Sequence, residues 1–235
     1  ADAKLTSLAQ LMDRDLYGLT VGAFGAEPDV DGNGRVIVLL TPVVNRMSKA
    51  SECVQRGYVT GFFYGLDELE REPDGNKGEI FYAFVPDSAG RHSCAHAESD
   101  VVRLLQGTFV HELQHLISFN QHVLTRGGEV EQTWLNEGLS HIAEELGSKM
   151  YEARFPAPLG RSTKEQIFPD SAGPFIAPLL LNAYAYLNSA LEHSVTAYEG
   201  VGSLEERGAP WLFLRWLGDQ KGDAIFRRLV EAPVT

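Results

Sequence analysis

Residues 108–116 read Thr-Phe-Val-His-Glu-Leu-Gln-His-Leu, and they lie in a run, residues 100–119, that is apolar almost all round a helix. A helix with that pattern is buried. His111 and His115 are four residues apart, about 400° of helical rotation, so both imidazoles leave the same face one turn apart. Glu112 lies about 100° further round the helix than His111. Burying these three polar side chains is costly unless they act together.

The spacing of the two histidines is typical of a zinc site. Both imidazoles can reach one tetrahedral ion at about 2.0–2.1 Å, and a catalytic zinc needs a third protein ligand and one open position. Residues 134–141 read Trp-Leu-Asn-Glu-Gly-Leu-Ser-His and offer Glu137 as that ligand, with room after His115 for a loop and the start of a second helix. We therefore predict one zinc ion per chain, bound by His111, His115 and Glu137, with Glu112 as the general base.

The two zinc segments together resemble the gluzincins, the group of thermolysin and aminopeptidase N. The surrounding sequence resembles the hyicolysin-type secreted bacterial peptidases more closely, over residues 29–45, 78–87, 108–119, 134–146 and 207–217. The resemblance implies an α+β, zincin-like fold and a single metallopeptidase catalytic domain over residues 1–235. Its upper lobe, residues 1–119, would hold a small mixed sheet and the active-site helix. Its helical lobe, residues 120–235, would carry the glutamate ligand.

The chain departs from the gluzincin pattern at two places. Thermolysin-like enzymes have an aspartate four residues after the ligand glutamate, and this aspartate orients a zinc histidine. His141 occupies that position here. The resemblance therefore implies a different partner for the zinc histidines, Glu144 or Glu145. Aminopeptidases have a tyrosine three residues before a Gly-Ala pair, and Glu205 occupies that position here. The aminopeptidase strand Gly-Ala-Met-Glu-Asn is also absent. These departures favour an endopeptidase, with an aminopeptidase as the alternative.

Hydrophobic periodicity and turn residues predict the other elements. A helix is expected first, then strands, then helices only, which is an α+β order. Asp100 and Thr133 are the expected N-caps of the two zinc-binding helices, and Gly147 is expected to end the second. Residues 154–175 are expected to form a long loop, either a surface excursion or a rim of the substrate cleft. The expected helices are residues 4–16, 100–119, 134–146, 179–193, 209–217 and 223–230, and the expected strands are 35–44, 61–66 and 79–85.

The predicted reaction is hydrolysis of a peptide bond. Zinc would polarise the water and the scissile carbonyl, while Glu112 takes a proton from the water and passes it to the leaving amine. The oxyanion needs a second donor besides zinc. Tyr198 and His193 are the best placed by sequence distance. Tyr184, Tyr186 and Arg207 remain open, and each of these side chains more often has a structural role. The strand 79–85 is expected to bind substrate backbone at a sheet edge.

Composition excludes other classes of partner. The formal net charge of −12, from 32 acidic and 20 basic residues, argues against nucleic acid, which needs a basic face. Apolar runs fall short of the roughly 20 residues that span a bilayer. Cys53 and Cys94 suit either one disulfide in a secreted protein or two idle thiols in the cytosol. We predict a disulfide, export, a monomer, and a peptide or protein substrate.

Two further clusters have a metal-like spacing. Asp29-x-Asp31-x-Asn33-Gly34 resembles the start of a calcium loop, but the twelfth position, which needs a bidentate glutamate, is Leu40. A simple turn is therefore favoured over a Ca²⁺ site. Residues 92–96, His-x-Cys-x-His, are interpreted as a surface loop with Cys94 in a disulfide rather than a second metal cluster.

A rival from another class is a secreted binding module with a non-catalytic, structural zinc. Such a site normally has a fourth protein ligand, often cysteine. Neither cysteine is near the zinc segments in sequence, and Glu112 would have no purpose there.

Overall fold

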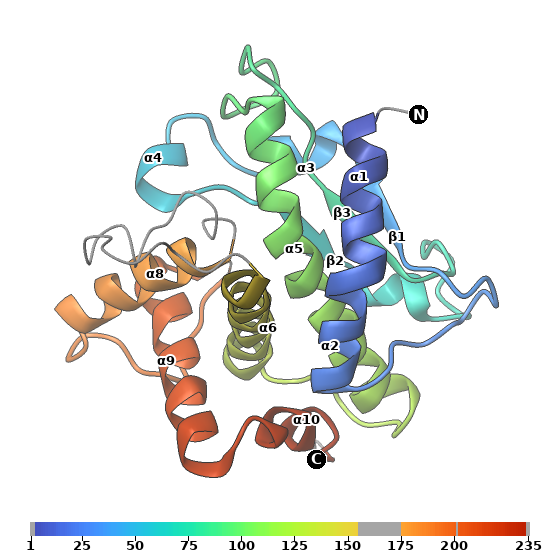
Figure 1. The fold of residues 1–235 in the computed structure, drawn as a ribbon, viewed down its shortest axis with the longest axis vertical. Coiled ribbons are helices and arrows are strands. Elements are labelled where there is room, and N and C mark those ends of the chain that lie inside the picture. Colours follow the sequence, from blue (N-terminus) through green and yellow to red (C-terminus); the bar gives the residue numbers. More distant parts are fainter. Residues whose placement is uncertain (1–2, 155–174, 201, 234–235) are drawn as a thin grey trace.

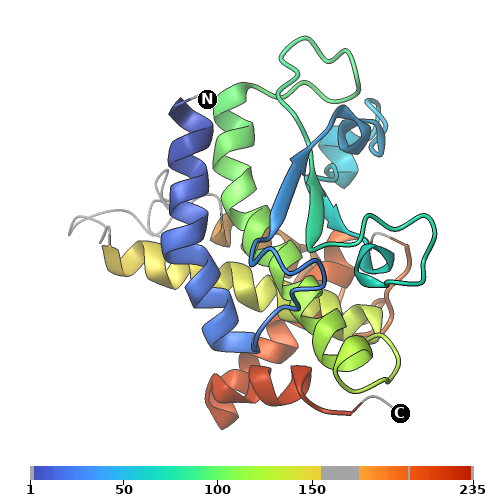
Figure 2. The same cartoon turned by 90° about the vertical axis from the view of Figure 1, so that its right-hand side faces the viewer.

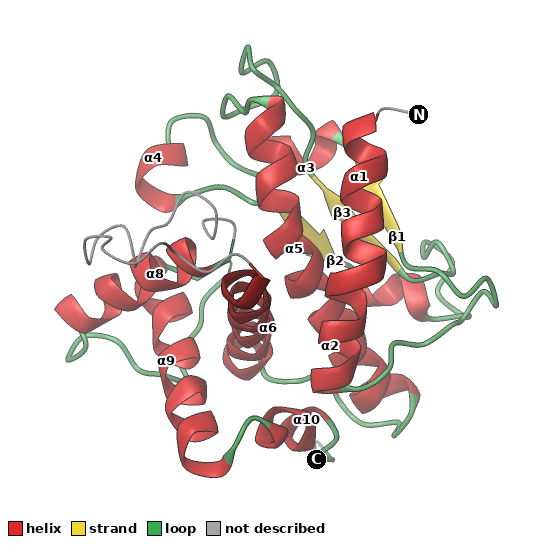
Figure 3. Ribbon diagram, in the orientation of Figure 1, coloured by secondary structure: helices red, strands yellow, loops and turns green. Residues whose placement is uncertain are grey.

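The computed structural model describes residues 3–154, 175–200 and 202–233. Helices form most of this part, and a small three-stranded sheet lies to one side (Figure 3). Figure 1 gives the order of the elements along the chain. The α+β expectation agrees with this architecture. None of the described helices is long and apolar enough to cross a membrane.

The sheet is mixed and has the order β1-β3-β2. Strand β3 (Ile80–Ala83) is central, and it pairs in parallel with β1 (Ile37–Leu40) and antiparallel with β2 (Gly61–Phe63). The prediction that residues 79–85 form a substrate-binding edge is therefore wrong, because both sides of β3 are already paired. The first strand is shorter than predicted because Thr41 caps a new helix, α3 (Pro42–Arg46), with proline in its first turn.

Helix α5 (Glu98–Phe119) packs across the sheet and carries the first zinc segment. Its N-cap is Ala97, so Asp100 lies in the first turn of the helix and is not the cap that was predicted. Gly61 permits the close approach of β2, because a Cβ at that position would lie 2.6 Å from Thr108 Cγ2. The sheet therefore lies directly against the turn of α5 that bears Glu112.

Helix α6 (Thr133–Arg154) carries the second predicted zinc segment and, at 22 residues, is about two and a half turns longer than the predicted helix 134–146. Thr133 is its first residue rather than a residue outside it. Gly147 lies inside the helix, where a Cβ would meet the ring of Phe175 at 2.7 Å. This glycine is required by packing and does not end the helix. The predicted loop 154–175 falls almost entirely outside the described residues.

The N-terminal segment forms a longer helical rod than the predicted helix 4–16. It runs through α1 (Ala3–Leu11), a π-helical turn, η1 (Met12–Leu16), and α2 (Tyr17–Phe24), and ends at Gly25, whose φ is 113°. Figure 2 shows this rod in blue beside green α5, with the strands on the opposite side of α5. The rod and the sheet thus enclose the helix that bears the two histidines.

Three C-terminal helices complete the described fold: α8 (Ile176–Asn188), α9 (Leu204–Lys221) and α10 (Ala224–Val230). Helix α9 begins five residues earlier than predicted, at a capping box between Ser203 and Glu206. It packs against both α6 and α8. The shorter elements are the helix α4 (Cys53–Arg56), the 3-10 turn η2 (Gly65–Glu68) and the π-helical turn η3 (Asn120–Leu124).

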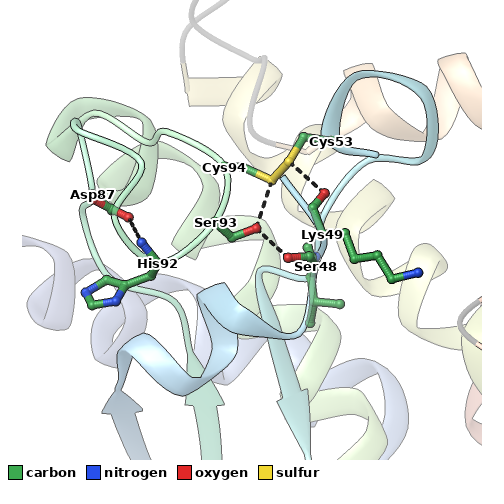
Figure 4. Close-up of a disulfide and its surroundings, with 8 residues drawn as sticks. Ser48, Lys49, Cys53, Asp87, His92, Ser93 and Cys94 are labelled. Atoms are coloured by element: carbon green, nitrogen blue, oxygen red, sulfur yellow. Dashed lines mark hydrogen bonds between the residues drawn. A yellow bond between two sulfur atoms is a disulfide. The ribbon is translucent and has the colours of Figure 1, made fainter. Parts of the chain in front are cut away.

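Cys53 and Cys94 form a disulfide with a Cα–Cα distance of 6.1 Å, which confirms the predicted pairing. It joins the first residue of α4 to the loop that precedes α5 (Figure 4). In the same loop, Ser93 Oγ donates a hydrogen bond to the carbonyl of Ser48. The loop that leads into α5 is therefore attached to a segment more than forty residues earlier by one covalent bond and one hydrogen bond.

Candidate metal centre

The three predicted ligand side chains lie together, on α5 and α6. His111 Nε2 is 3.5 Å from one oxygen of Glu137, and His115 Nε2 is 3.6 Å from the other. One ligand atom from each residue lies within 4.8 Å of the others. Two ligand atoms that bind a tetrahedral zinc at about 2.0–2.2 Å are about 3.3–3.6 Å apart. The donor set and its spacing therefore fit a zinc ion with three protein ligands.

The electrostatics of this cluster favour a cation. Burial acts to raise the pKa of the Glu137 carboxyl group. The hydrogen bond from His111 and the charges of the neighbouring imidazoles lower it more strongly, so that the pKa lies well below its usual range. Burial lowers the pKa of His115 to about 4, so this imidazole is neutral at neutral pH, as a metal ligand must be. Burial also acts to lower the pKa of His111, but Glu137 and Glu144 together raise it well above its ordinary value. A positive charge is thus stabilised between these carboxylates.

Glu144 orients His111. Its Oε1 lies 2.7 Å from Nδ1 of His111 and 2.9 Å from Nδ1 of His141. These three side chains also have the composition of a metal site. However, 2.7 and 2.9 Å are hydrogen-bond distances and are shorter than the separation of two ligands on one tetrahedral ion. Glu144 therefore fixes the His111 ring so that Nε2 faces Glu137.

Glu145, the other partner suggested by the sequence, faces a different helix. It accepts hydrogen bonds from Trp211 Nε1 at 3.0 Å and from Arg215 at 3.1 Å, both on α9. Lys149 forms an ion pair with the same carboxylate at 2.7 Å. Glu145 therefore holds α6 against α9, on a different side of α6 from the partner of His111.

Glu112 is 5% exposed and lies against β2, because a Cβ at Gly61 would be 3.6 Å from Glu112 Cγ. Burial raises its pKa to about 7, and the charges of Glu137 and Glu144 act in the same direction. The charge of His111 and a hydrogen bond from the backbone N–H of Phe63 oppose that rise in the pKa. A carboxyl group with a pKa near neutrality can both accept and return a proton at working pH.

The two predicted oxyanion donors are in different surroundings. The Tyr198 hydroxyl, in the segment between α8 and α9, forms hydrogen bonds with Glu137 and Arg207, and burial raises the pKa of Tyr198. His193 instead lies near Glu205. Tyr184 on α8 is 69% exposed. The structure thus brings Tyr198 and Arg207 to the cluster of proposed ligands, whereas His193 is near Glu205 in the first turn of α9.

A cavity of about 240 Å³ opens beside His115, and sequence reasoning did not predict it. Its walls come from three separate segments: the end of β2, the end of α5 and the loop before α6. Most of the lining is apolar. The lining residues are Phe63, Tyr64, Gly65, Leu66, His115, Ser118, Phe119, Val130, Glu131 and Asn136. A periodicity search misses such a cavity because no single element contains its pattern.

The segment 92–96 is not a metal cluster among the described residues. Cys94 is in the disulfide, and His92 Nδ1 contacts Arg46 at 3.2 Å. His96 is buried against the rings of Tyr58 and Phe84, with centroid distances of 4.3 and 5.0 Å. The interpretation of this segment as a disulfide-bearing loop agrees with these contacts.

No family model matches the chain. The chain is 27% identical over 146 residues to the neutral metalloprotease ShpI of Staphylococcus hyicus. The match covers 62% of this chain and 31% of that protein, so the chain corresponds to about a third of the relative's length. This distant similarity supports a relationship to a metallopeptidase.

Proposed function

We propose that this chain is a zinc metallopeptidase of the gluzincin type, similar to the hyicolysin-type peptidases, that hydrolyses peptide bonds as an endopeptidase. The proposal rests on one observation. Two imidazole nitrogens lie 3.5 and 3.6 Å from the two oxygens of Glu137, with the buried carboxyl of Glu112 beside them. The distant similarity to a metalloprotease is consistent with this reading. We treat residues 1–235 as one catalytic domain with lobes 1–119 and 120–235.

His111, His115 and Glu137 would hold one Zn²⁺, and the ion supplies Lewis-acid polarisation of the scissile carbonyl and of the attacking water. The chain prepares each ligand for this role. Glu144 accepts the Nδ1 proton of His111, so Nε2, which lies 3.1 Å from Ser140 Oγ, is the nitrogen that would bind the metal. Burial keeps His115 neutral, and Glu137 stays ionised.

Glu112 handles the proton. Its carboxylate accepts a proton from the attacking water and then delivers it to the leaving amine, which needs one group that acts first as base and then as acid. A pKa of about 7 suits both halves of that cycle. The hydrogen bond from the Phe63 backbone fixes the carboxylate on the side of the site where β2 lies.

Tyr198 and Arg207 are the proposed stabilisers of the oxyanion. Both are donors, and the Tyr198 hydroxyl already lies beside Glu137. Burial disfavours the phenolate, so Tyr198 keeps its proton and can donate it in a hydrogen bond. His193 is retained only as the second sequence-based candidate.

Strand β2 and the cavity beside His115 would bind the substrate. β2 pairs with β3 on one side only among the described residues, so its other edge can accept an extended peptide. The cavity walls are mainly apolar and fit a large apolar side chain next to the cleaved bond. Glu131, the acidic residue in these walls, faces His122 at 3.3 Å. An aminopeptidase needs an acidic group free to bind an α-amine, so this pairing favours the endopeptidase.

Secretion is part of the proposal. The disulfide between Cys53 and Cys94 is consistent with an oxidising compartment, and none of the described helices is suited to cross a membrane. We expect a monomer that acts on peptides or proteins.

The decisive experiment compares wild type with Glu112→Gln. Glutamine keeps the size of the side chain but cannot accept a proton near neutral pH. The variant should therefore bind one zinc per chain and lose casein and peptide cleavage by about 10²–10⁴-fold or more. Zinc content and cleavage are measured on the same preparation, with wild type stripped by a chelator and reloaded with zinc as the control. Cleavage near the wild-type rate with zinc retained would remove Glu112 from the mechanism, and no cleavage by zinc-loaded wild type would favour the structural-zinc alternative.

A further inference from the structure

A second group of carboxylates lies where the loop between α2 and β1 meets the start of β3. Oxygens of Asp29, Asp31 and Glu79 lie within 4.8 Å of one another. Glu79 Oε1 accepts a hydrogen bond from the Val30 backbone at 2.6 Å, which fixes this carboxylate against the loop. The parallel pairing of β1 with β3 produces the juxtaposition, because Ile37 N donates to the Glu79 carbonyl at 2.7 Å.

Buried carboxylate oxygens without hydrogen-bond partners lie in and near this group. Glu79 is 1% exposed, and its Oε2 has no hydrogen-bond partner. Glu68 is 2% exposed, both of its oxygens lack partners, and it lines the same open cavity as Asp29 and Val30. Oε2 of Glu27 is likewise buried and without a partner. Buried carboxylates in this condition are costly unless a cation or a proton neutralises them.

The protein's own cations do not neutralise them. Within the described ranges, no lysine, arginine or histidine forms an ion pair with these carboxylates, and nearby Lys77 donates to the backbone carbonyls of Leu69 and Glu72. Burial, with the charges of Glu79, Asp67 and Glu27, raises the pKa of Glu68 to about 9. Burial also raises the pKa of Glu79. By contrast, the neighbouring carboxylate of Asp67 is satisfied by Tyr82 and Asn76 and is not left unpartnered.

We propose that Asp29, Asp31 and Glu79 bind one Ca²⁺, whose charge would also offset the buried carboxyl group of nearby Glu68. The donors are all oxygens, which suit a hard cation and not zinc. Two oxygens that bind calcium at about 2.3–2.6 Å can be up to about 5.2 Å apart, so three oxygens that all lie within 4.8 Å of one another are compatible with one ion. Magnesium demands a stricter octahedron at about 2.0–2.1 Å, which fits less well.

This site explains the incomplete calcium loop of the sequence. The loop supplies Asp29 and Asp31, but position 40 is a leucine in β1 rather than the required glutamate. In the folded chain Glu79, the residue before β3, adds a third carboxylate to Asp29 and Asp31. The ion would connect the loop to β3 and so stabilise the sheet that supports Glu112.

The test is thermal melting and calorimetric titration of the zinc-loaded protein with CaCl₂, with MgCl₂ as the comparison. Calcium should bind saturably at one site and raise the melting temperature by about 5–10 °C at about 100 times its Kd. Magnesium should have a smaller effect. Asp31→Asn and Glu79→Gln should abolish the calcium response. Asp74→Asn, an exposed acidic residue in the segment between η2 and β3, should keep it.

The calcium-free proteins give an independent readout. Glu79→Gln removes a buried, uncompensated charge, so without calcium it should melt at or above the wild-type temperature. Asp31 is exposed, so Asp31→Asn should fold normally. This variant therefore tests the site even if Glu79→Gln does not fold. The proposal is overturned if wild type shows no saturable calcium binding. It is also overturned if Asp31→Asn keeps the calcium response, or if magnesium gives an equal response.

Discussion

Nδ1 of His111 lies 2.7 Å from Oε1 of Glu144, so the ring nitrogen that remains for a metal is Nε2, which faces Glu137. The bond crosses between α5 and α6 and thereby makes the orientation of one ligand depend on the packing of two helices. A glutamate thus takes the orienting role although His141 occupies the place of the aspartate found in thermolysin-like enzymes.

The first prediction concerns this bond. Glu144→Ala should weaken zinc binding by about 10–100-fold, the usual effect of losing the partner of a zinc histidine. Glu144→Gln should have a smaller effect, because its amide oxygen still accepts the Nδ1 proton. Zinc affinity is measured by competition with a chromophoric chelator.

Glu145→Gln is the matched control for Glu144. This neighbour pairs with Arg215 and Trp211, so its replacement should lower the melting temperature and leave zinc affinity unchanged. Equal zinc affinity in Glu144→Ala and wild type would show that Glu144 does not orient His111.

The sequence alone indicates the three proposed zinc ligands, because local rules relate them to one another. Four-residue spacing on a helix fixes the relation of His111 to His115, and the Asn-Glu-Gly segment indicates Glu137. The choice between Glu144 and Glu145 is different. These residues are adjacent on α6 and about 100° apart around it, and only the packing of α6 between α5 and α9 decides which of them faces the site.

Local sequence patterns also could not predict the order of the strands in the sheet or the contacts between segments distant in the chain. The predicted strands 61–66 and 79–85 correspond to β2 and β3, yet nothing in their own sequence showed that β3 is central. The approach of Glu79 to Asp29 depends on the parallel register of β1 and β3. The same holds for the cavity beside His115, whose walls come from three segments.

The second prediction concerns the disulfide. Denatured, unreduced protein should show no free thiols, because Cys53 and Cys94 are joined. The double variant Cys53→Ser, Cys94→Ser should lose about 3–4 kcal/mol on the chain-entropy model, or roughly 5–15 °C in melting temperature. Thiol titration and thermal melting test these values. Two reactive thiols per chain, or an unchanged melting temperature in the double variant, would contradict them.

The third prediction concerns pH. Burial against Tyr58 and Phe84 lowers the pKa of His96, although Asp87 and Asp100 act against this shift. A folded-state pKa below the unfolded value means that protonation favours unfolding. The stability from neutral His96 is therefore full above about pH 6.5 and is lost as the pH falls below it.

His96→Phe tests this prediction because it keeps an aromatic ring and cannot titrate. Its melting temperature should fall less than that of wild type between about pH 7.5 and about pH 5.5. Exposed His92 in the same loop is the matched control, and His92→Gln should follow the wild-type curve. Identical curves for wild type and His96→Phe would show that His96 does not contribute to acid sensitivity.

The fourth prediction assigns a role to Tyr198. Its hydroxyl forms hydrogen bonds with Glu137 and Arg207, whereas His193 lies near Glu205. Tyr198→Phe keeps the ring, which packs on Gly202, and removes only the donor. If the hydroxyl stabilises the oxyanion, kcat should fall by about 10²–10³-fold, with zinc content and KM little changed.

A purely orienting role makes a different prediction. If Tyr198 only positions Glu137, Tyr198→Phe should weaken zinc binding, and excess zinc should restore kcat. His193→Gln, from the same segment between α8 and α9, should cleave at nearly the wild-type rate. Peptide-cleavage kinetics at saturating zinc separate the two roles, because lost transition-state stabilisation persists there and a weakened ligand does not. A wild-type kcat for Tyr198→Phe at every zinc concentration would remove the hydroxyl from both roles and leave Arg207 as the remaining donor beside Glu137.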